Sequence, residues 1–337
     1  MGILFGTHVE FLEHDPGSYH PESALRLRAV AEAAASLGEA IVPFTPTPAP
    51  SRSILAVHSS AHLAQLRQYS LMGGGPIDED TSVSAQSYDA AILAAGAGID
   101  AATMLQSGLY PAAFVAVRPP GHHATQTQSM GFCLLNNVAI TARELTAKGG
   151  KVAIVDFDAH HGNGTQAIFW DDPSILYISI HQYPLYPGTG RLAEIGGGEA
   201  QGLTINIPLP PLSSGVTALA ALELIADAAL DSFKPDWMLI SAGYDGHFND
   251  PLTEMGYTDR DFYAFTKWAA SKVSYGRTIA FLEGGYDLPA LTASTKATFL
   301  ALLGERLPTE SLDERGRADS DLVANLARLR SEALAAG

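Results

Sequence analysis

The sequence predicts an α/β fold in which a parallel β-sheet is flanked by helices on both faces. Short apolar segments rich in β-branched residues alternate with longer helical patterns along all 337 residues, and this order places helices against a parallel sheet. The apolar segments are hydrophobic at nearly every position, as expected for strands covered on both faces. Because no internal repeat and no long linker divides the chain, we expect one domain spanning residues 1–337.

The most apolar segment, 152–155, is expected to be a buried strand, since its residues are all hydrophobic and mostly β-branched. Further strands are expected at 41–44, 112–117, 174–180, 204–208, 237–241 and 278–282. A short apolar segment, 3–5, opens the chain. These segments provide the sheet.

Helical patterns fill the intervals between the strands. They are expected at 21–37, 60–71, 84–105, 133–147, 216–232, 289–303 and 319–335. Pro21 fits the first turn of a helix, and the alanine-rich segment 84–105 favours a long helix packed closely on the sheet. Arg26 is either solvated or tucked beneath an active site. The segment 72–81, MGGGPIDEDT, is expected to be a flexible acidic loop.

Composition and charge exclude several classes of function. Hydrophobic residues make up 47% of the chain, enough for a large core. The chain lacks both an apolar window of about 18 residues and an N-terminal signal pattern, so we expect a soluble, cytoplasmic protein with no membrane partner. The net charge of −16 argues against nucleic-acid binding and would attract cationic substrates. The single cysteine, Cys133, excludes an intrachain disulfide and fits a small buried hydrophobe better than a nucleophile.

Ligand-type side chains follow the 152–155 strand directly. In an extended chain alternate residues share a face, so Asp156, Asp158 and His160 should point the same way. Such residues can also be helix caps or solvated loop residues. However, burying two carboxylates and an imidazole after so apolar a strand is costly without a metal or a partner. The segment therefore indicates a site for a divalent metal.

Two further segments bring histidine chemistry to the strand ends. Gly162 and Gly164 allow a sharp turn, and Asn163 between them can hydrogen-bond a neighbouring imidazole. His122 and His123 follow the 112–117 strand on a Pro-Gly turn, from which both rings can reach a site. We therefore interpret the pair as functional rather than structural.

Residues that follow later strands complete a catalytic set. The carboxyl ends of parallel strands share one edge, where open α/β sheets bind their ligands. Asp245 could join Asp158 and His160 there as three ligands of one catalytic metal, and zinc, iron, manganese or cobalt would suit this set. Tyr286, after paired glycines, could donate a hydrogen bond to an oxyanion. With a histidine to move protons, these groups suit metal-assisted hydrolysis of an unactivated carbonyl.

Six sequence blocks resemble the signature blocks of the histone deacetylase family. They are RPPGHHA, GFCLLNN, DFDAHHGNGTQ, YISIHQYPLYPGTG, SAGYDGHFNDP and LEGGYDL, and they run in the family's order over roughly residues 15–300. The HHGNGTQ form is similar to the class II branch and its bacterial relatives. The resemblance implies an arginase/deacetylase-like fold and a zinc-dependent deacetylase that uses metal-activated water.

The resemblance also implies roles for individual residues. One zinc ion per chain would be bound by Asp158, His160 and Asp245. His123 would be the main general base and acid, and His122 its partner, held by Asp156. Asn163 would support His123, and Tyr286 would polarise the acyl carbonyl.

A narrow substrate channel and a second cation are implied in the same way. Gly131, Phe132 and Tyr186 would line the channel for an acyl-lysine stem, and Asp80 would sit at its rim to hold the substrate backbone. A structural potassium ion would take oxygen ligands from Asp156, Asp158, His160, Ser179 and Ile180.

Two substrate classes stay open. Acyl-lysine in a protein or peptide is favoured because Leu252 follows Asp250 and Pro251 where polyamine-specific relatives carry a glutamate. Acetylpolyamine amidohydrolases share the same blocks, the acidic charge suits a polycation, and Glu254 lies only two residues away.

Two other readings are less favoured. An arginase-like binuclear manganese hydrolase needs more bridging carboxylates than the sequence offers, although Asp250 is uncommitted. A non-catalytic acyl-lysine binder would not need the intact set of ligands, histidines and Tyr286. The sequence leaves open whether the protein forms a homo-oligomer.

Overall fold

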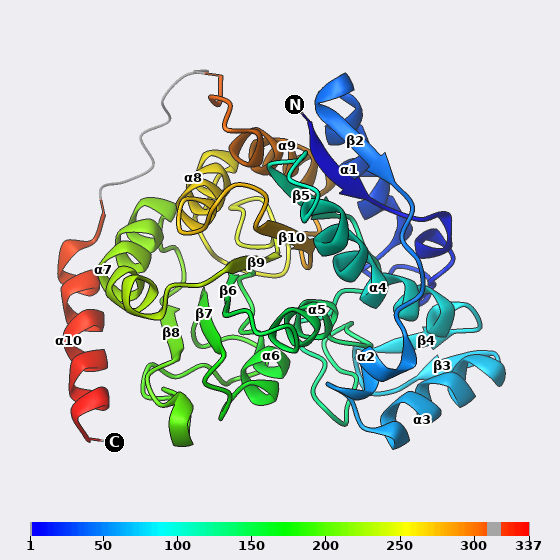
Figure 1. Ribbon diagram of the computed structural model, residues 1–337, viewed down its shortest axis with the longest axis horizontal. Helices are drawn as coiled ribbons and strands as arrows, with labels where there is room; N and C mark the ends of the chain where they lie inside the picture. The colour runs from blue at the N-terminus through cyan, green and yellow to red at the C-terminus, as the bar shows by residue number, and fades with distance from the viewer. Residues whose placement is uncertain (1, 309–317, 337) are drawn as a thin grey trace.

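An eight-stranded sheet forms the centre of the computed structural model, which describes residues 2–308 and 318–336 (Figure 1). The strand order is β2-β1-β5-β10-β9-β6-β7-β8, and every neighbouring pair is parallel. The strands are β1 (Ile3–Gly6), β2 (Ile41–Phe44), β5 (Ala112–Val115), β6 (Val152–Asp156), β7 (Ile175–Gln182), β8 (Thr204–Leu209), β9 (Trp237–Ala242) and β10 (Thr278–Leu282). The predicted parallel sheet is therefore confirmed.

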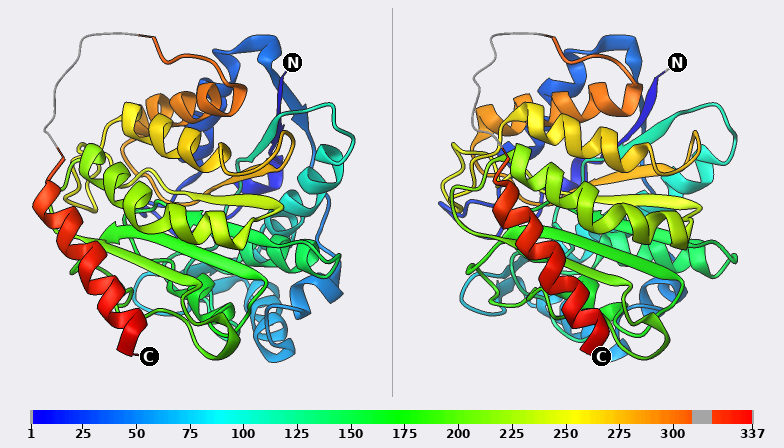
Figure 2. Two further views of the ribbon diagram at one scale, coloured as in Figure 1. Left: turned by 60° about the vertical axis from the view of Figure 1, so that its left-hand side comes forward. Right: turned by 90° about the vertical axis from the view of Figure 1, so that its left-hand side faces the viewer.

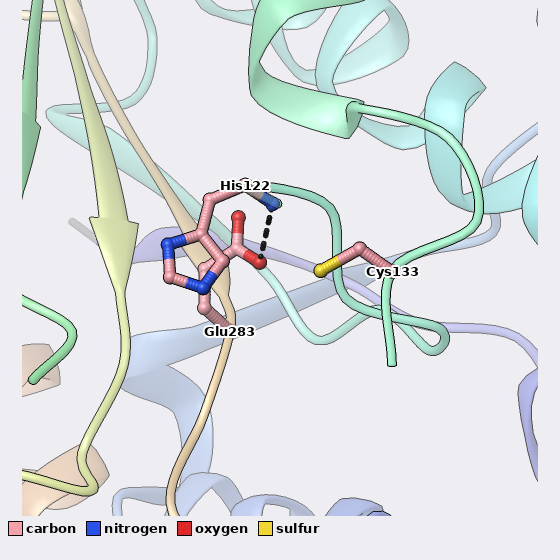
Figure 3. A group of neighbouring side chains, drawn as sticks. All are labelled: His122, Cys133 and Glu283. Atoms are coloured by element: carbon pink, nitrogen blue, oxygen red, sulfur yellow. Dashed lines mark hydrogen bonds between the residues drawn. The ribbon is translucent and has the colours of Figure 1, made fainter. Parts of the chain in front are cut away.

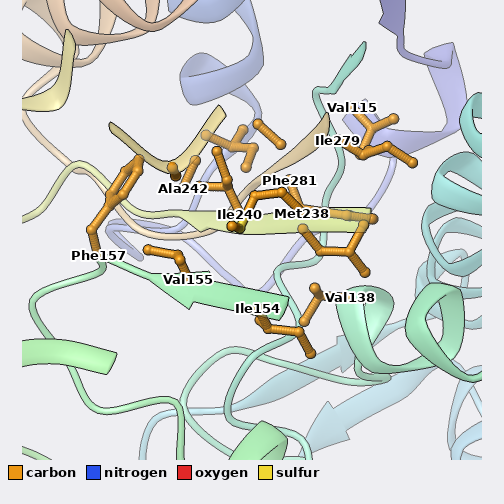
Figure 4. Packing of buried hydrophobic residues seen from close by; sticks show 14 of the residues in the cluster. Val115, Val138, Ile154, Val155, Phe157, Met238, Ile240, Ala242, Ile279 and Phe281 are labelled. Carbon is orange, nitrogen blue, oxygen red and sulfur yellow. The ribbon is translucent and has the colours of Figure 1, made fainter. Parts of the chain in front are cut away.

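The five strands β5, β10, β9, β6 and β7 are buried at every residue. Their apolar side chains pack on both faces of the sheet, as Figure 4 shows around Val155, Ile240 and Phe281. Such continuous burial explains why their sequences are hydrophobic at successive positions rather than at alternate ones.

Helices cover both faces of the sheet (Figure 2). On one face α1 packs on α9, α9 on α8, and α8 on α7, while α4 and α5 pair on the other. The helices are α1 (Ala24–Ala35), α2 (Ser51–Leu55), α3 (Ser60–Leu71), α4 (Ser87–Leu105), α5 (Asn137–Thr146), α6 (Asn163–Ile168), α7 (Gly215–Phe233), α8 (Asp259–Ala270), α9 (Leu288–Leu303) and α10 (Ser320–Ala336). None of the helices within the described residues is long and apolar enough to cross a membrane.

Local capping corrects several predicted boundaries. The first helix begins at Ala24, after the extended Ser23, rather than at Pro21. Helix α5 begins at Asn137 rather than at Cys133, because the Asn136 side chain accepts a hydrogen bond from the Ala139 amide and ends the preceding loop.

A small hairpin and the helices α2, α6 and α8 were not predicted. The expected flexible loop 72–81 contributes to a small antiparallel hairpin of β3 (Gly74–Pro76) and β4 (Ser82–Ser84), so α4 starts at Ser87 instead of Ser84. Helix α8 was missed, although Thr258 and Asp261 form a capping box at its start.

Candidate active site

The three predicted metal ligands meet at the carboxyl ends of β6 and β9. These strands are paired in register, so the segments that leave them lie side by side. His160 Nδ1 lies 2.8 Å from Asp245 Oδ2 and 3.2 Å from Asp158 Oδ1. One ligand atom from each residue lies within 4.8 Å of the other two, so a single cation could contact all three.

Backbone amides and close glycine packing hold the two carboxylates. Asp158 Oδ2 accepts a hydrogen bond from the Gly284 amide (2.8 Å), and Asp245 Oδ1 accepts one from the Ala159 amide (2.8 Å). A Cβ at Gly243 would lie 1.9 Å from Asp158 Oδ2, and one at Gly284 would lie 2.5 Å from Asp245 Oδ2. No side chain fits at these glycines without displacing a ligand.

The electrostatics of this group favour a positive charge. Burial raises the pKa of Asp245 to about 6, and the neighbouring Asp158 adds to the shift. Burial would lower the pKa of His160, but the carboxylates of Asp245 and Asp158 outweigh it and raise that pKa to about 10. Two buried carboxylates and an imidazole are a donor set that fits a divalent cation such as zinc.

The histidine pair lies beside the three ligands, each ring with its own partner. The two ring centroids are 4.0 Å apart. His122 Nδ1 is 3.0 Å from Asp156 Oδ2, and His123 Nδ1 is 2.8 Å from Asn163 Oδ1. Because both partner oxygens accept hydrogen bonds, each Nδ1 carries a proton. The unshared electron pair of neutral His123 is therefore on Nε2.

The two rings differ in their affinity for a proton. For His122, burial lowers the pKa, but the carboxylates of Asp156 and Asp158 overcome this and raise it to about 10. For His123, burial lowers the pKa well below its ordinary value, and the charges of His122 and His160 add to that effect. At neutral pH His123 is thus the ring able to accept a proton.

A pocket of about 240 Å³ leads to these groups. It is lined by Asp80, Pro120, His122, His123, Gly131, Phe132, Asp158, His160, Leu185, Tyr186, Leu252, Gly284 and Tyr286. The rings of Phe132 and Tyr286 pack edge to face at 5.9 Å, as do those of Tyr186 and His123 at 5.2 Å. All five residues predicted to contact substrate therefore line one pocket.

The β3–β4 hairpin places Asp80 at this pocket. Its Oδ1 accepts hydrogen bonds from the Gly131 amide (3.2 Å) and from Thr81 Oγ1 (2.7 Å). The His20 ring donates to the Asp80 carbonyl oxygen (3.1 Å) and packs on Phe132 at 4.6 Å. Asp80 thus holds the turn that carries the channel residues.

Sequence reasoning wrongly treated Asp250 as uncommitted. Its Oδ2 accepts hydrogen bonds from the amides of Tyr286 (2.7 Å) and Asp287 (3.3 Å), so it fixes the Tyr286 backbone. Within residues 2–308 and 318–336, the groups able to hold a metal are Asp158/His160/Asp245 and His122/Cys133/Glu283. Neither includes Asp250 as a bridge.

Arg26 is buried beneath the site rather than solvated. Its Nε donates to the Gly285 carbonyl (2.7 Å), its Nη2 donates to the Glu283 carbonyl, and its guanidinium lies 5.1 Å from the centre of the Tyr286 ring. Glu22, also buried, pairs with Arg26 at 3.1 Å. The sequence signal was only the spacing of four residues between this acid and this base.

Buried His58 supports the loop that carries Gly131. Its Nδ1 donates to the Thr125 carbonyl (2.8 Å), and its Nε2 accepts from the Asn136 amide (2.9 Å). Burial lowers the pKa of His58 to about 3, and the neighbouring His62 adds to the shift. Between about pH 3 and 6.5 the His58 ring is therefore neutral in the folded protein but protonated in the unfolded chain.

We expect His58 to lower the free energy of unfolding progressively as the pH falls below 6.5, the ordinary pKa of its ring. His58→Gln should be less stable than wild type at neutral pH. The difference in the free energy of unfolding between the two proteins should narrow by about 1.4 kcal/mol per pH unit from about pH 6 to 4. Only wild type must keep the His58 ring neutral on folding, so only wild type loses this stability. Urea unfolding of both proteins across this range measures it, and a constant gap would contradict the assignment.

Comparisons with known proteins agree with this geometry. The family described as "Histone deacetylase domain" matches residues 20–302. A "Probable deacetylase" of Archaeoglobus fulgidus is 40% identical over 310 residues, covering 90% of this chain and 86% of that protein. "Histone deacetylase 14, chloroplastic" of Arabidopsis thaliana is 42% identical over 243 residues, covering 69% of this chain and 56% of that one. The crystal structure of the HDA15 HD domain superposes with a TM-score of 0.90 at 34% identity, covering 99% of this chain and 97% of that one. The chain therefore belongs to the histone deacetylase family.

Proposed function

We propose that the protein is a zinc-dependent amidohydrolase that removes acetyl or other acyl groups from lysine side chains. The observation that carries this proposal is geometric. Asp158, His160, the histidine pair and Tyr286 come from three separate segments and line a single pocket. Asp245, from a fourth segment, places its carboxylate within ligand distance of Asp158 and His160. Family membership supports the same reaction type.

The proposed reaction divides its tasks among residues of this chain. His123 takes a proton from water as the water oxygen bonds to the acyl carbon, and it returns a proton to the amine nitrogen as the C–N bond breaks. His122, held by Asp156, keeps its positive charge beside the developing negative charge. The Tyr286 hydroxyl donates a hydrogen bond to the acyl oxygen. The products are a carboxylic acid and a free amine, and the acid proton then moves to the amine to give a carboxylate and an ammonium ion.

Asp158, His160 and Asp245 are the residues that would hold the zinc. When bound, zinc supplies polarisation of the carbonyl and a lowered pKa of water. We also propose a structural potassium ion held by oxygens of Asp156, Asp158, His160, Ser179 and Ile180. The register of β6 and β7, which pairs Asp156 with Ser179, supports this second proposal.

Replacing Asp245 by alanine is expected to abolish zinc binding. The variant should retain less than about a tenth of one zinc per chain after dialysis, since two ligands do not hold zinc firmly. Metal analysis of purified protein measures this. Asp227→Ala, which removes a half-exposed carboxylate paired with Lys272, is the control and should keep the wild-type content. Full zinc occupancy in the Asp245 variant would overturn the ligand assignment.

Acyl-lysine is the preferred substrate class. Leu252 lines the pocket, whereas Glu254 is not among the described lining residues, and its backbone is bound to Gln182 and Leu212. A polycation therefore meets an apolar side chain at this position. Comparing turnover of an acetyl-lysine peptide with that of acetylputrescine tests the ranking, and faster acetylputrescine hydrolysis would reverse it.

The other readings gain less support. A binuclear manganese site would need Asp250, which is bound to backbone amides. A non-catalytic binder would not need the Tyr286 hydroxyl or a neutral His123. We further propose that residues 1–337 form one catalytic domain, because the described sheet and helices pack around one core. Action in the cytoplasm on protein or peptide substrates is a separate part of this proposal.

A further inference from the structure

A buried carboxylate that the proposed reaction does not use lies under the histidine pair. The Glu283 side chain is fully buried. Its Oε2 accepts hydrogen bonds from the Gly121 amide (2.7 Å) and the His122 amide (3.2 Å), and its Oε1 accepts one from Ser241 Oγ (3.4 Å). Figure 3 shows the carboxylate beside the His122 ring, with the Cys133 thiol pointing toward it.

Burying the Glu283 carboxylate away from water costs folding free energy. Burial raises the pKa of the Glu283 side chain to about 7, and no arginine or lysine within the described residues donates a hydrogen bond to its two carboxylate oxygens. Its partners are instead two consecutive amides and one hydroxyl. The amides belong to the turn from which both catalytic rings project, so the position of the carboxylate bears directly on those rings.

The backbone of Glu283 is itself held firmly. Its amide donates to the Ala242 carbonyl (3.1 Å), and its carbonyl oxygen accepts from Arg26. The next residue, Gly284, donates its amide to the ligand Asp158 (2.8 Å). Glu283 therefore connects a rigid strand end, next to the metal ligands, with the turn that carries the histidine pair.

We propose that Glu283 is a positioning residue: by accepting the Gly121 and His122 amides, it fixes the turn from which the rings of His122 and His123 reach the substrate. This inference rests on the proposed function, which gives that pair the proton transfers. Displacing a catalytic group by about 1 Å can lower the reaction rate by about 100-fold.

A second metal site at His122, Cys133 and Glu283 is a weaker interpretation of the same cluster. Their ligand atoms lie within 4.8 Å of one another. However, Glu283 Oε2 already accepts two amides and His122 Nδ1 already faces Asp156, so a cation bound through these two atoms would compete with those bonds.

Two conservative variants of Glu283 distinguish the effect of side-chain length from the effect of the negative charge. Glu283→Gln keeps the length of the side chain and an acceptor oxygen, whereas Glu283→Asp keeps the charge but withdraws the acceptor by one methylene. We expect kcat to stay within about threefold of wild type in the Gln variant and to fall about tenfold or more in the Asp variant, with KM changed less than about twofold in both. Hydrogen exchange at Gly121 and His122 should rise only in the Asp variant.

A kcat for Glu283→Gln no higher than that for Glu283→Asp would overturn the inference. Asp261→Ala is the control, because it removes a half-buried carboxylate of the α8 capping box and should lower stability while leaving kcat unchanged. Zinc-loaded wild type that hydrolyses neither acetyl-lysine nor acetylputrescine would overturn the proposed function instead. The exchange measurement does not depend on turnover, so the two failures are distinguishable.

Discussion

Replacing His123 by alanine is expected to lower kcat by about 10²–10⁴-fold, the usual contribution of a positioned general acid or base. Its ring is neutral at physiological pH because burial and neighbouring positive charges lower its pKa. Asn163 holds Nδ1, which leaves Nε2 as the proton acceptor. Alanine removes that acceptor but no metal ligand. Steady-state kinetics and zinc analysis of the variant measure the two effects separately.

The fold should survive this substitution, and thermal unfolding checks that it does. His8→Ala is a suitable control, since the His8 ring caps a short 3-10 helix (Val9–Leu12) and does not line the active-site pocket. We expect that variant to keep kcat within about twofold. A His123→Ala enzyme with zinc bound and kcat within tenfold of wild type would remove His123 from the proposed reaction.

The place of the site could be predicted from sequence because a parallel sheet collects strand ends at one edge. Asp158 and Asp245 are far apart in the chain, yet each follows a strand, and the two strands are neighbours. The order of the strands was not readable from the sequence. The resemblance to the family's signature blocks indicated that Asp158 and Asp245 act together. In the structure their carboxylates lie within 4.8 Å of each other.

What sequence reasoning missed is mainly support from backbone atoms. Asp250 looked free because its partners are amides, which every residue offers and no motif marks. Glu283 was overlooked for the same reason. Arg26 was left undecided, since an arginine in a helix is usually solvated and only the tertiary packing buries it.

Helix α8 was missed for a different reason. Its sequence, DRDFYAFTKWAA, interleaves charged residues with a buried face of Phe262, Phe265 and Ala269, which recur at helical spacing. Its apolar face, which includes Phe262 and Phe265, packs on Phe157 next to the metal-ligand segment. Two sequence signals were available, the capping box at Thr258 and Asp261 and the helical spacing of the apolar residues. Both follow shortly after the Asp245 block, which drew the interpretation to the metal site.

Replacing Tyr286 by phenylalanine is expected to lower kcat by about 10²–10³-fold, as the loss of one oxyanion donor does in other hydrolases. Burial raises the pKa of the Tyr286 hydroxyl well above its ordinary value, so the group stays protonated and able to donate. The loss should therefore be similar from about pH 6 to 9. Zinc content should not change, because Tyr286 is not a ligand.

Tyr257→Phe is the matched control for this variant. The Tyr257 hydroxyl is buried and has no hydrogen-bond partner among the described residues, so its removal should leave kcat unchanged and stability equal or higher. Contrasting results for the two variants would separate the loss of a transition-state donor from the loss of a buried hydroxyl. A fully active Tyr286→Phe enzyme would mean that the acyl oxygen is stabilised without this ring. The pocket would then hold acyl-lysine, but the tyrosine would only shape its wall.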